Sequence, residues 1–102
     1  ENMGRDLTPF GWENKKGTSD RKCKCGSWKE HWKKFTGKAW PTFCCASDCK
    51  SVPDVGAHVV NRYEHDEWIV PLCSKCNMRT GTFDLKFGTI LAPASRQNTC
   101  GY

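Results

Sequence analysis

The sequence predicts a small α+β domain that depends on cross-links for its stability, and three observations support this prediction. The chain has 102 residues, so a hydrophobic core alone would leave the fold marginally stable. Eight cysteines and five tryptophans supply cross-links and large apolar surfaces. One helical pattern is followed by several strand patterns, with no internal repeat. We therefore expect one domain of mixed helix and strand.

Residues 1–21 are polar, contain glycine and show no periodicity, so we expect an extended or mobile arm that Phe10 and Trp12 anchor. A single cysteine-rich domain then covers residues 22–102. Basic residues are concentrated near the N-terminal end: residues 1–40 hold ten Lys or Arg and five Asp or Glu, whereas residues 41–102 hold six of each. This distribution predicts a basic face for nucleic acid or for an acidic protein surface, and the alternative is a set of solvated lysines.

An amphipathic helix is expected after residue 27. Ser27 and Glu30 form a capping box, in which each side chain accepts a hydrogen bond from a free amide, and Gly37 is a natural end. The apolar face of this helix is formed by Trp28, Trp32 and Phe35. This stripe is expected to pack on a sheet, with base stacking as the alternative. The candidate nucleic-acid contacts are Lys29, Lys33 and Lys34.

Strand patterns follow in the second half of the chain. Val55–Asn61 and residues 68–72 are expected to form two strands joined by a charged loop over residues 62–67. A short helix is expected to begin at Cys73 and to end near Gly81. Phe83, Leu85 and Phe87 alternate as in a strand, and residues 89–92 would return as its partner in a C-terminal hairpin.

Two close pairs of cysteines flank the first two strands. Cys45 and Cys49 form one pair and Cys73 and Cys76 the other, and their spacing matches tetrahedral zinc coordination. The order of cysteine pair, strand, strand, cysteine pair and short helix is that of a treble-clef fold. In this layout zinc holds the first pair against the helix N-terminus, and its binding energy contributes to folding. Four thiolates would make the site closed and structural.

The remaining cysteines, with one nearby histidine, form a second set: Cys23, Cys25, Cys44, Cys100 and His31. A second zinc ion, two disulfides or free buried thiols would each account for them. Adjacent Cys44 and Cys45 point in opposite directions in an extended chain, so they are expected to serve different sites. Cys23 and Cys25 are poorly placed to bridge each other. Zinc or free thiols would favour an intracellular location and disulfides a secreted one, and no apolar run is long enough to cross a membrane.

Two short motifs lie in the same region: Gly56-Ala57-His58-Val59, and Val70-Pro71-Leu72-Cys73-Ser74-Lys75-Cys76-Asn77. Residues 44–81, which contain both motifs, resemble the HNH endonuclease superfamily. The resemblance implies a ββα-metal core in which His58 acts as general base on water. It also implies that Asn77 helps to hold a catalytic divalent ion such as Mg²⁺ or to orient the site.

The catalytic part of the motif is degenerate. Ala57 stands where the family has an acidic metal ligand, and Trp68 stands where it has an asparagine. The resemblance implies a zinc-binding HNH-like domain that contacts nucleic acid, and an HNH-type endonuclease if His58 is active. The alternative is a non-catalytic zinc- or disulfide-stabilised protein with a binding or assembly role.

Overall fold

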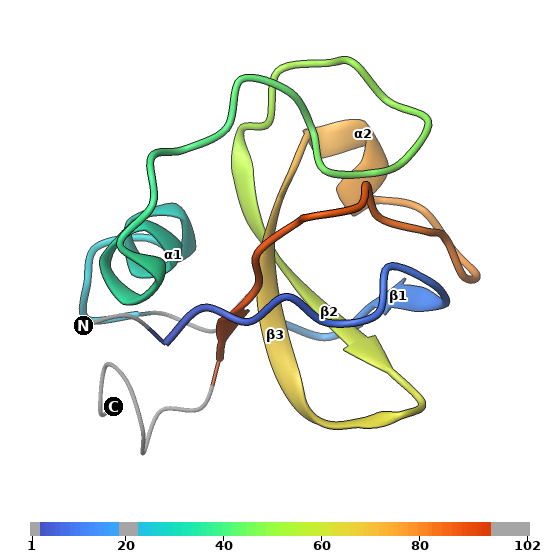
Figure 1. The fold of residues 1–102 in the computed structure, drawn as a ribbon, viewed down its shortest axis with the longest axis horizontal. Coiled ribbons are helices and arrows are strands. Elements are labelled where there is room, and N and C mark those ends of the chain that lie inside the picture. Colours follow the sequence, from blue (N-terminus) through green and yellow to red (C-terminus); the bar gives the residue numbers. More distant parts are fainter. Residues whose placement is uncertain (1–2, 19–22, 95–102) are drawn as a thin grey trace.

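A four-stranded antiparallel sheet forms the centre of the structure (Figure 1). The computed structural model describes residues 3–18 and 23–94. Its elements are β1 (Trp12–Asn14), α1 (Trp28–Thr36), β2 (Val55–Asn61), β3 (Glu64–Leu72), α2 (Ser74–Asn77) and β4 (Ala92–Pro93). The strands follow the order β1-β2-β3-β4, with α1 beside the sheet and α2 at one end of β3 (Figure 1). The predicted α+β class is therefore confirmed.

Helix α1 has the boundaries that its sequence predicts. It begins after Ser27, whose Oγ accepts a hydrogen bond from the backbone N–H of Glu30 at 3.1 Å. It ends at Gly37, which adopts a left-handed conformation with φ of 68° and donates its N–H to a carbonyl one turn earlier at 3.1 Å. The apolar face packs on the sheet, and Trp32 and Phe35 are buried.

The first turn of α1 lies directly against β2 at Gly56. A Cβ atom on Gly56 would lie 2.5 Å from the carbonyl carbon of Trp28 and 2.7 Å from the backbone nitrogen of Lys29. Glycine is therefore needed there for the close approach of helix and strand. The Trp28 ring packs edge-on against the imidazole of His58, with 4.4 Å between the ring centroids. The helix thus covers the part of β2 that carries the predicted general base.

Strands β2 and β3 form a hairpin that is tighter than predicted. β2 has the predicted bounds, but β3 begins at Glu64, so the connection is reduced to Arg62 and Tyr63. Asn61 shapes this turn, because its Oδ1 accepts a hydrogen bond from the Tyr63 N–H at 3.0 Å. Residues 64–67 were expected in a loop because they are charged. Their side chains are exposed or half-buried, so their charge is compatible with a strand.

The described part of the N-terminal segment, residues 3–18, contributes a strand to the sheet. β1 pairs with β2, with Trp12 opposite Asn61. Trp12 is fully buried, and its Nε1 donates to the Thr8 carbonyl at 2.7 Å. Trp12 therefore anchors the segment as expected, whereas Phe10 is 56% exposed.

The predicted C-terminal hairpin does not form within the described residues. Phe83 bridges to Trp12 and Leu85 bridges to Ala46, while residues 92–93 form β4 and pair with β3. The apolar alternation that predicted a strand has another cause. Phe83 and Leu85 are buried against segments that are distant in the sequence. Their alternation therefore results from burial in the core and not from pairing with the next segment.

Helix α2 is a single turn and ends at Asn77 rather than near Gly81. The side chain of Asn14 on β1 contacts the residues at the end of this helix. Its Nδ2 donates to the carbonyl of Cys76 at 3.0 Å and to that of Arg79 at 3.1 Å. The last carbonyls of a helix need such partners, because no intrahelical N–H is available to them. The Asn14 side chain therefore ties β1 to the end of α2.

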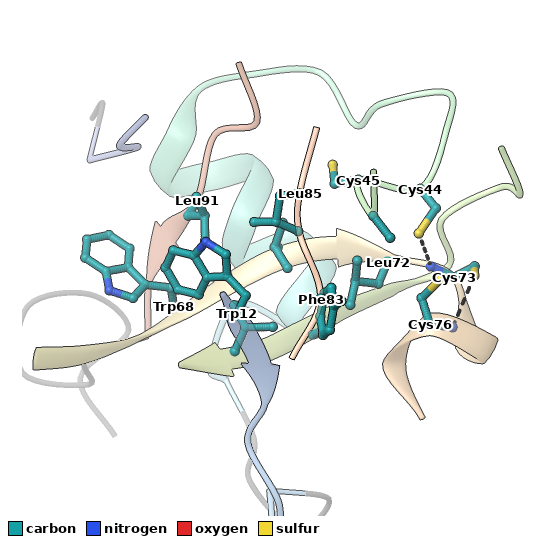
Figure 2. Packing of buried hydrophobic residues seen from close by; sticks show 14 residues of the cluster. Trp12, Cys44, Cys45, Trp68, Leu72, Cys73, Cys76, Phe83, Leu85 and Leu91 are labelled. Carbon is teal, nitrogen blue, oxygen red and sulfur yellow. Dashed lines mark hydrogen bonds between the residues drawn. The ribbon is translucent and has the colours of Figure 1, made fainter. Parts of the chain in front are cut away.

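The main core lies between the sheet, the loop before β2 and the segment after α2 (Figure 2). Its apolar members include Trp12, Val59, Val70, Leu72, Phe83, Leu85 and Leu91. Several cysteines of the loop and of α2 belong to the same cluster. A smaller cluster joins α1 to β3 and β4 through Trp32, Ile69, Ala92 and Ala94. Within residues 3–18 and 23–94, no helix is long and apolar enough to cross a membrane.

Candidate metal centres

Four cysteines, Cys44, Cys49, Cys73 and Cys76, converge where β3 leads into α2. Their Sγ atoms all lie within 4.8 Å of one another. Cys44 and Cys49 come from the loop before β2. Cys73 is the N-cap of α2, and Cys76 lies within that helix (Figure 2). The Sγ atoms of Cys49 and Cys73 are 3.7 Å apart. Two thiolates bound to one tetrahedral zinc ion are about 3.8 Å apart, so this four-cysteine group can hold a metal ion.

Backbone amides point at the sulfurs of the four-cysteine group. The Cys73 N–H donates to Cys44 Sγ at 3.3 Å, the Cys76 N–H to Cys73 Sγ at 3.4 Å, and the Ser51 N–H to Cys49 Sγ at 3.4 Å. Such bonds stabilise a thiolate more than a thiol. Those from Ser51 are the main reason why the pKa of Cys49 is lowered to about 6.

Burial acts in the opposite direction on two members of the group. It raises the pKa of Cys44 and that of Cys76, because a buried thiolate loses its hydration. A divalent cation among the four sulfurs would offset this cost, and its binding would release protons. Four sulfur donors would leave no open coordination position, so a metal ion here would be structural.

Lys86 holds the loop that carries Cys44 and Cys49. Its Nζ donates to the backbone carbonyls of both residues, each at 2.6 Å. Within the loop, the Cys49 N–H also donates to the Ala46 carbonyl at 3.1 Å. The position of the loop therefore depends on the segment that follows α2.

Cys44, rather than the predicted Cys45, belongs to this group. The Cys45 sulfur points away from Cys44, Cys73 and Cys76 in Figure 2, and burial raises the pKa of Cys45 to about 11. Chain alternation places the two neighbours on different sides, as expected, but a spacing of three or four residues fits zinc equally well. The Cys44 sulfur is the one that faces the N-terminus of α2, because it accepts a hydrogen bond from the Cys73 N–H at 3.3 Å.

A second group, Cys23, Cys25 and His31, also has its ligand atoms within 4.8 Å of one another. The two cysteines lie on the turn before α1, and His31 lies on α1. Cys23 Sγ is 3.1 Å from His31 Nδ1. His31 is fully buried, and burial lowers its pKa, so the neutral imidazole is favoured. This group can hold a metal ion when its cysteines are thiolates.

The predicted second set also included Cys44 and Cys100. Cys44 belongs to the four-cysteine group, and Cys100 lies outside the described residues. Within the group, Cys23 is disulfide-bonded, whereas Cys25 is a thiol. Cys23 therefore belongs to a candidate metal-binding group and also forms a disulfide, which are two of the predicted alternatives.

His58 and Asn77 line one cavity of about 200 Å³, between β2, α2 and the start of α1. Thr18 and Trp28 complete its wall together with residues 55–57. His58 is 6% exposed, while Asn77 is exposed. The described residues that line this cavity include no carboxylate. The two residues that the HNH resemblance singles out thus lie in the same cavity.

Lys29, Lys33 and Lys34 lie along α1, and each has a partner there or nearby. Lys33 Nζ is 3.4 Å from a carboxylate oxygen of Glu30. The ammonium group of Lys29 lies 5.1 Å from the ring centroid of Trp40, and that of Lys34 lies 5.3 Å from the ring of the next residue. Lys34 is exposed, and Lys29 and Lys33 are partly exposed, so all three can reach a partner molecule.

Lys15 was not singled out in the sequence, but it lies beside the cavity. Its backbone N–H donates to the His58 carbonyl at 2.9 Å. Lys75 lies on α2, two residues before Asn77, and both lysines are exposed. The pairing of β1 with β2 brings Lys15 there, and the only sequence signal for this was the expected anchor at Trp12.

Comparisons with models of protein families, with curated proteins and with solved structures found no match to this chain. Function is therefore inferred from the residues of this chain and from their geometry.

Proposed function

We propose that this chain is a zinc-binding, HNH-like domain of treble-clef type that contacts nucleic acid. The observation that carries the proposal is the four-cysteine group, whose sulfurs lie within 4.8 Å of one another. Four thiolates favour zinc over harder ions such as Mg²⁺ and Ca²⁺. A zinc ion there would fasten the loop before β2 to the N-terminus of α2.

The order of elements around this group supports the HNH-like assignment. The loop with Cys44 and Cys49 precedes the β2–β3 hairpin, and α2 follows directly with Cys73 and Cys76. This is the ββα arrangement that the resemblance implies. His58 on β2 and Asn77 on α2 line the same cavity, as the corresponding residues of the motif would be expected to do.

Lysines around this cavity support contact with nucleic acid. Lys15, Lys29 and Lys75 belong to the three segments that surround His58 and Asn77. The chain as a whole has a formal net charge of +5. Phosphate groups are the partner that such an arrangement of exposed cations fits, with the polar side chains of the cavity facing the sugar-phosphate backbone.

Metal-dependent phosphodiester hydrolysis is the second candidate, and the shared cavity of His58 and Asn77 is the observation that favours it. His58 would act as general base, and Asn77 would help to hold Mg²⁺. The donor set does not fit that ion well, because Ala57 replaces the acidic ligand and Mg²⁺ prefers carboxylate oxygens. Trp28 also packs over the His58 ring at 4.4 Å. We therefore propose binding as the main function.

Fluorescence anisotropy with labelled single- and double-stranded DNA and with RNA tests the binding proposal. We expect affinity to fall steeply as salt rises, because phosphate contacts release counterions. The double variant Lys15→Ala, Lys75→Ala should reduce the slope of log affinity against log salt by about two. The matched control, Lys38→Ala with Lys50→Ala, removes the same charge from exposed residues away from the cavity and should change the slope less.

Two results would contradict this proposal: no binding to any of the three probes at low salt, or an equal loss of affinity in the two double variants.

Incubation of supercoiled plasmid with the protein and Mg²⁺ distinguishes hydrolysis, the second candidate, from binding alone. We expect no nicking by the wild-type protein. Nicking that disappears in His58→Ala would establish hydrolysis instead.

A further inference from the structure

The group of Cys23, Cys25 and His31 has a geometry that nothing in the proposed function uses. Three potential ligand atoms from the turn before α1 and from α1 itself lie within 4.8 Å of one another. The 3.1 Å between Cys23 Sγ and His31 Nδ1 is shorter than the separation of about 3.5 Å that two ligands of one zinc ion adopt. A small outward shift of the two atoms would therefore admit an ion between them.

His31 is held in the orientation of a metal ligand. Its Nε2 lies 2.7 Å from the Pro93 carbonyl, which can only accept, so Nε2 carries the proton and donates it. Nδ1 is then the nitrogen with a lone pair, and it faces Cys23. Metal-binding histidines commonly donate their other N–H to a backbone carbonyl, because this fixes the tautomer and the direction of the ring.

The turn before α1 presents its two sulfurs on one side. The Gly26 N–H donates to the Cys23 carbonyl at 3.1 Å, and Gly26 has a φ of 110°, which favours glycine. The Cys25 N–H donates to Cys23 Sγ at 3.3 Å. This is the same kind of amide-to-sulfur bond that surrounds the four-cysteine group. Two cysteines at this spacing are poorly placed to bridge each other, so a shared metal ion suits them better.

We propose that Cys23, Cys25 and His31 bind a second zinc ion in the reduced protein, with water as the fourth ligand. Two thiolates and one imidazole are ligands that zinc takes readily. Cys25 is half-buried, so the ion has a side open to solvent for its water. The site shares no ligand with the four-cysteine group and does not rest on the proposed contact with nucleic acid.

The disulfide of Cys23 makes this site depend on the redox state. A disulfide sulfur carries no negative charge, so the oxidised protein lacks one of the three ligands. Reduction by a dithiol breaks the S–S bond and transfers two electrons and two protons to its sulfurs, which become two thiols. The dithiol is oxidised to its own disulfide. Zinc binding then releases one proton from Cys23 and one from Cys25.

Zinc content per chain, measured by elemental analysis and native mass spectrometry, tests this site. We expect one zinc ion in the untreated protein and two after reduction by a dithiol, anaerobic desalting and addition of Zn²⁺. Reduced Cys25→Ser and reduced His31→Ala should each hold one. The matched control, Cys45→Ser, changes a cysteine outside both groups and should hold two after reduction. One zinc ion in the reduced wild-type protein, or two in Cys25→Ser, would overturn the proposal.

Two further measurements do not depend on whether the His31 variant folds. In the wild-type protein loaded with Co²⁺, reduction should add a second set of d–d bands with weaker thiolate charge transfer per ion, because the new site has two sulfurs instead of four. An unchanged spectrum would contradict a second site. Reduced Cys100→Ser should keep two zinc ions, and loss of the second ion would refute the three-residue ligand set.

Discussion

The four-cysteine group and the group of Cys23, Cys25 and His31 differ in the parts of the chain that they fasten. The four-cysteine group joins the loop before β2 to α2, and its two halves are separated by the whole β2–β3 hairpin. The other group joins a turn to the helix that follows it. A cross-link between distant segments removes more entropy from the unfolded chain than a local one. A metal ion in the first group should therefore stabilise the whole fold, and one in the second should fix the position of α1.

Removing one ligand of the four-cysteine group should have the largest effect. Cys44→Ser is expected to lose zinc and to cost more than about 5 kcal/mol, because structural zinc contributes about 10–16 kcal/mol in small domains. Thermal unfolding followed by circular dichroism should then show no cooperative transition. Cys45→Ser is the matched control and should cost about 1 kcal/mol. Equal damage from the two substitutions would contradict the assignment of Cys44 to the metal group.

A smaller but still large effect is expected where α1 meets the sheet. Gly56→Ala would place a Cβ atom 2.5 Å from the Trp28 backbone, which cannot move without shifting the helix, so we expect a loss of about 3 kcal/mol. Gly4→Ala is the comparison, because its Cβ would meet side-chain atoms only, Ile90 Cγ2 at 2.6 Å and Thr36 Cγ2 at 3.2 Å, and we expect a smaller loss than from a clash with the backbone. Chemical denaturation of both variants with zinc bound measures the difference. If the two losses are the same, the close approach of α1 is not rigid.

Loss of the link between β1 and α2 should lower the stability of the fold less than Cys44→Ser or Gly56→Ala does. Asn14→Ala leaves the carbonyls of Cys76 and Arg79 without their side-chain donor, and we expect it to cost about 2 kcal/mol. Glu13→Ala, on the neighbouring exposed position of β1, should be nearly neutral. Urea denaturation gives both values. Equal stability of Asn14→Ala and the wild-type protein would show that water replaces these bonds without cost.

The smallest effect is expected at the start of α1. Ser27→Ala removes the acceptor for the Glu30 N–H and should cost about 1 kcal/mol. Ser27→Asp retains an acceptor at the same place and should recover most of this loss. Chemical denaturation measures the loss of overall stability, and amide hydrogen exchange in the first turn of α1 measures the local effect. Exchange in this turn should quicken in Ser27→Ala while the four-cysteine group keeps its zinc, and loss of that zinc would mean that the two regions are coupled.

Local signals in the sequence predicted the elements that depend on neighbouring residues. Ser27 and Gly37 bound α1 because a cap acts within one turn of the helix. The strand pattern from Val55 to Asn61 predicted β2 with the bounds that it has. The second half of the four-cysteine group, Cys73 and Cys76, followed from their spacing at a helix N-terminus.

Contacts between distant segments account for what could not be predicted. The choice between Cys44 and Cys45 depends on which sulfur the loop turns toward Cys73, and both spacings suit zinc. The side chain that contacts the end of α2 is that of Asn14, which lies 62 and 65 residues before its two acceptors. Contacts of this kind produce no periodic pattern in the sequence, because each involves a single polar side chain that looks like many others.

The two hydrogen bonds of Lys86 have a consequence for the order of events during protein synthesis. Lys86 lies 42 residues after Cys44 and 37 residues after Cys49, and it holds the backbone of both. A nascent chain therefore has to leave the ribosome beyond Lys86 before this loop can take its final position. Until then its cysteines are exposed to oxidants and to competing metals.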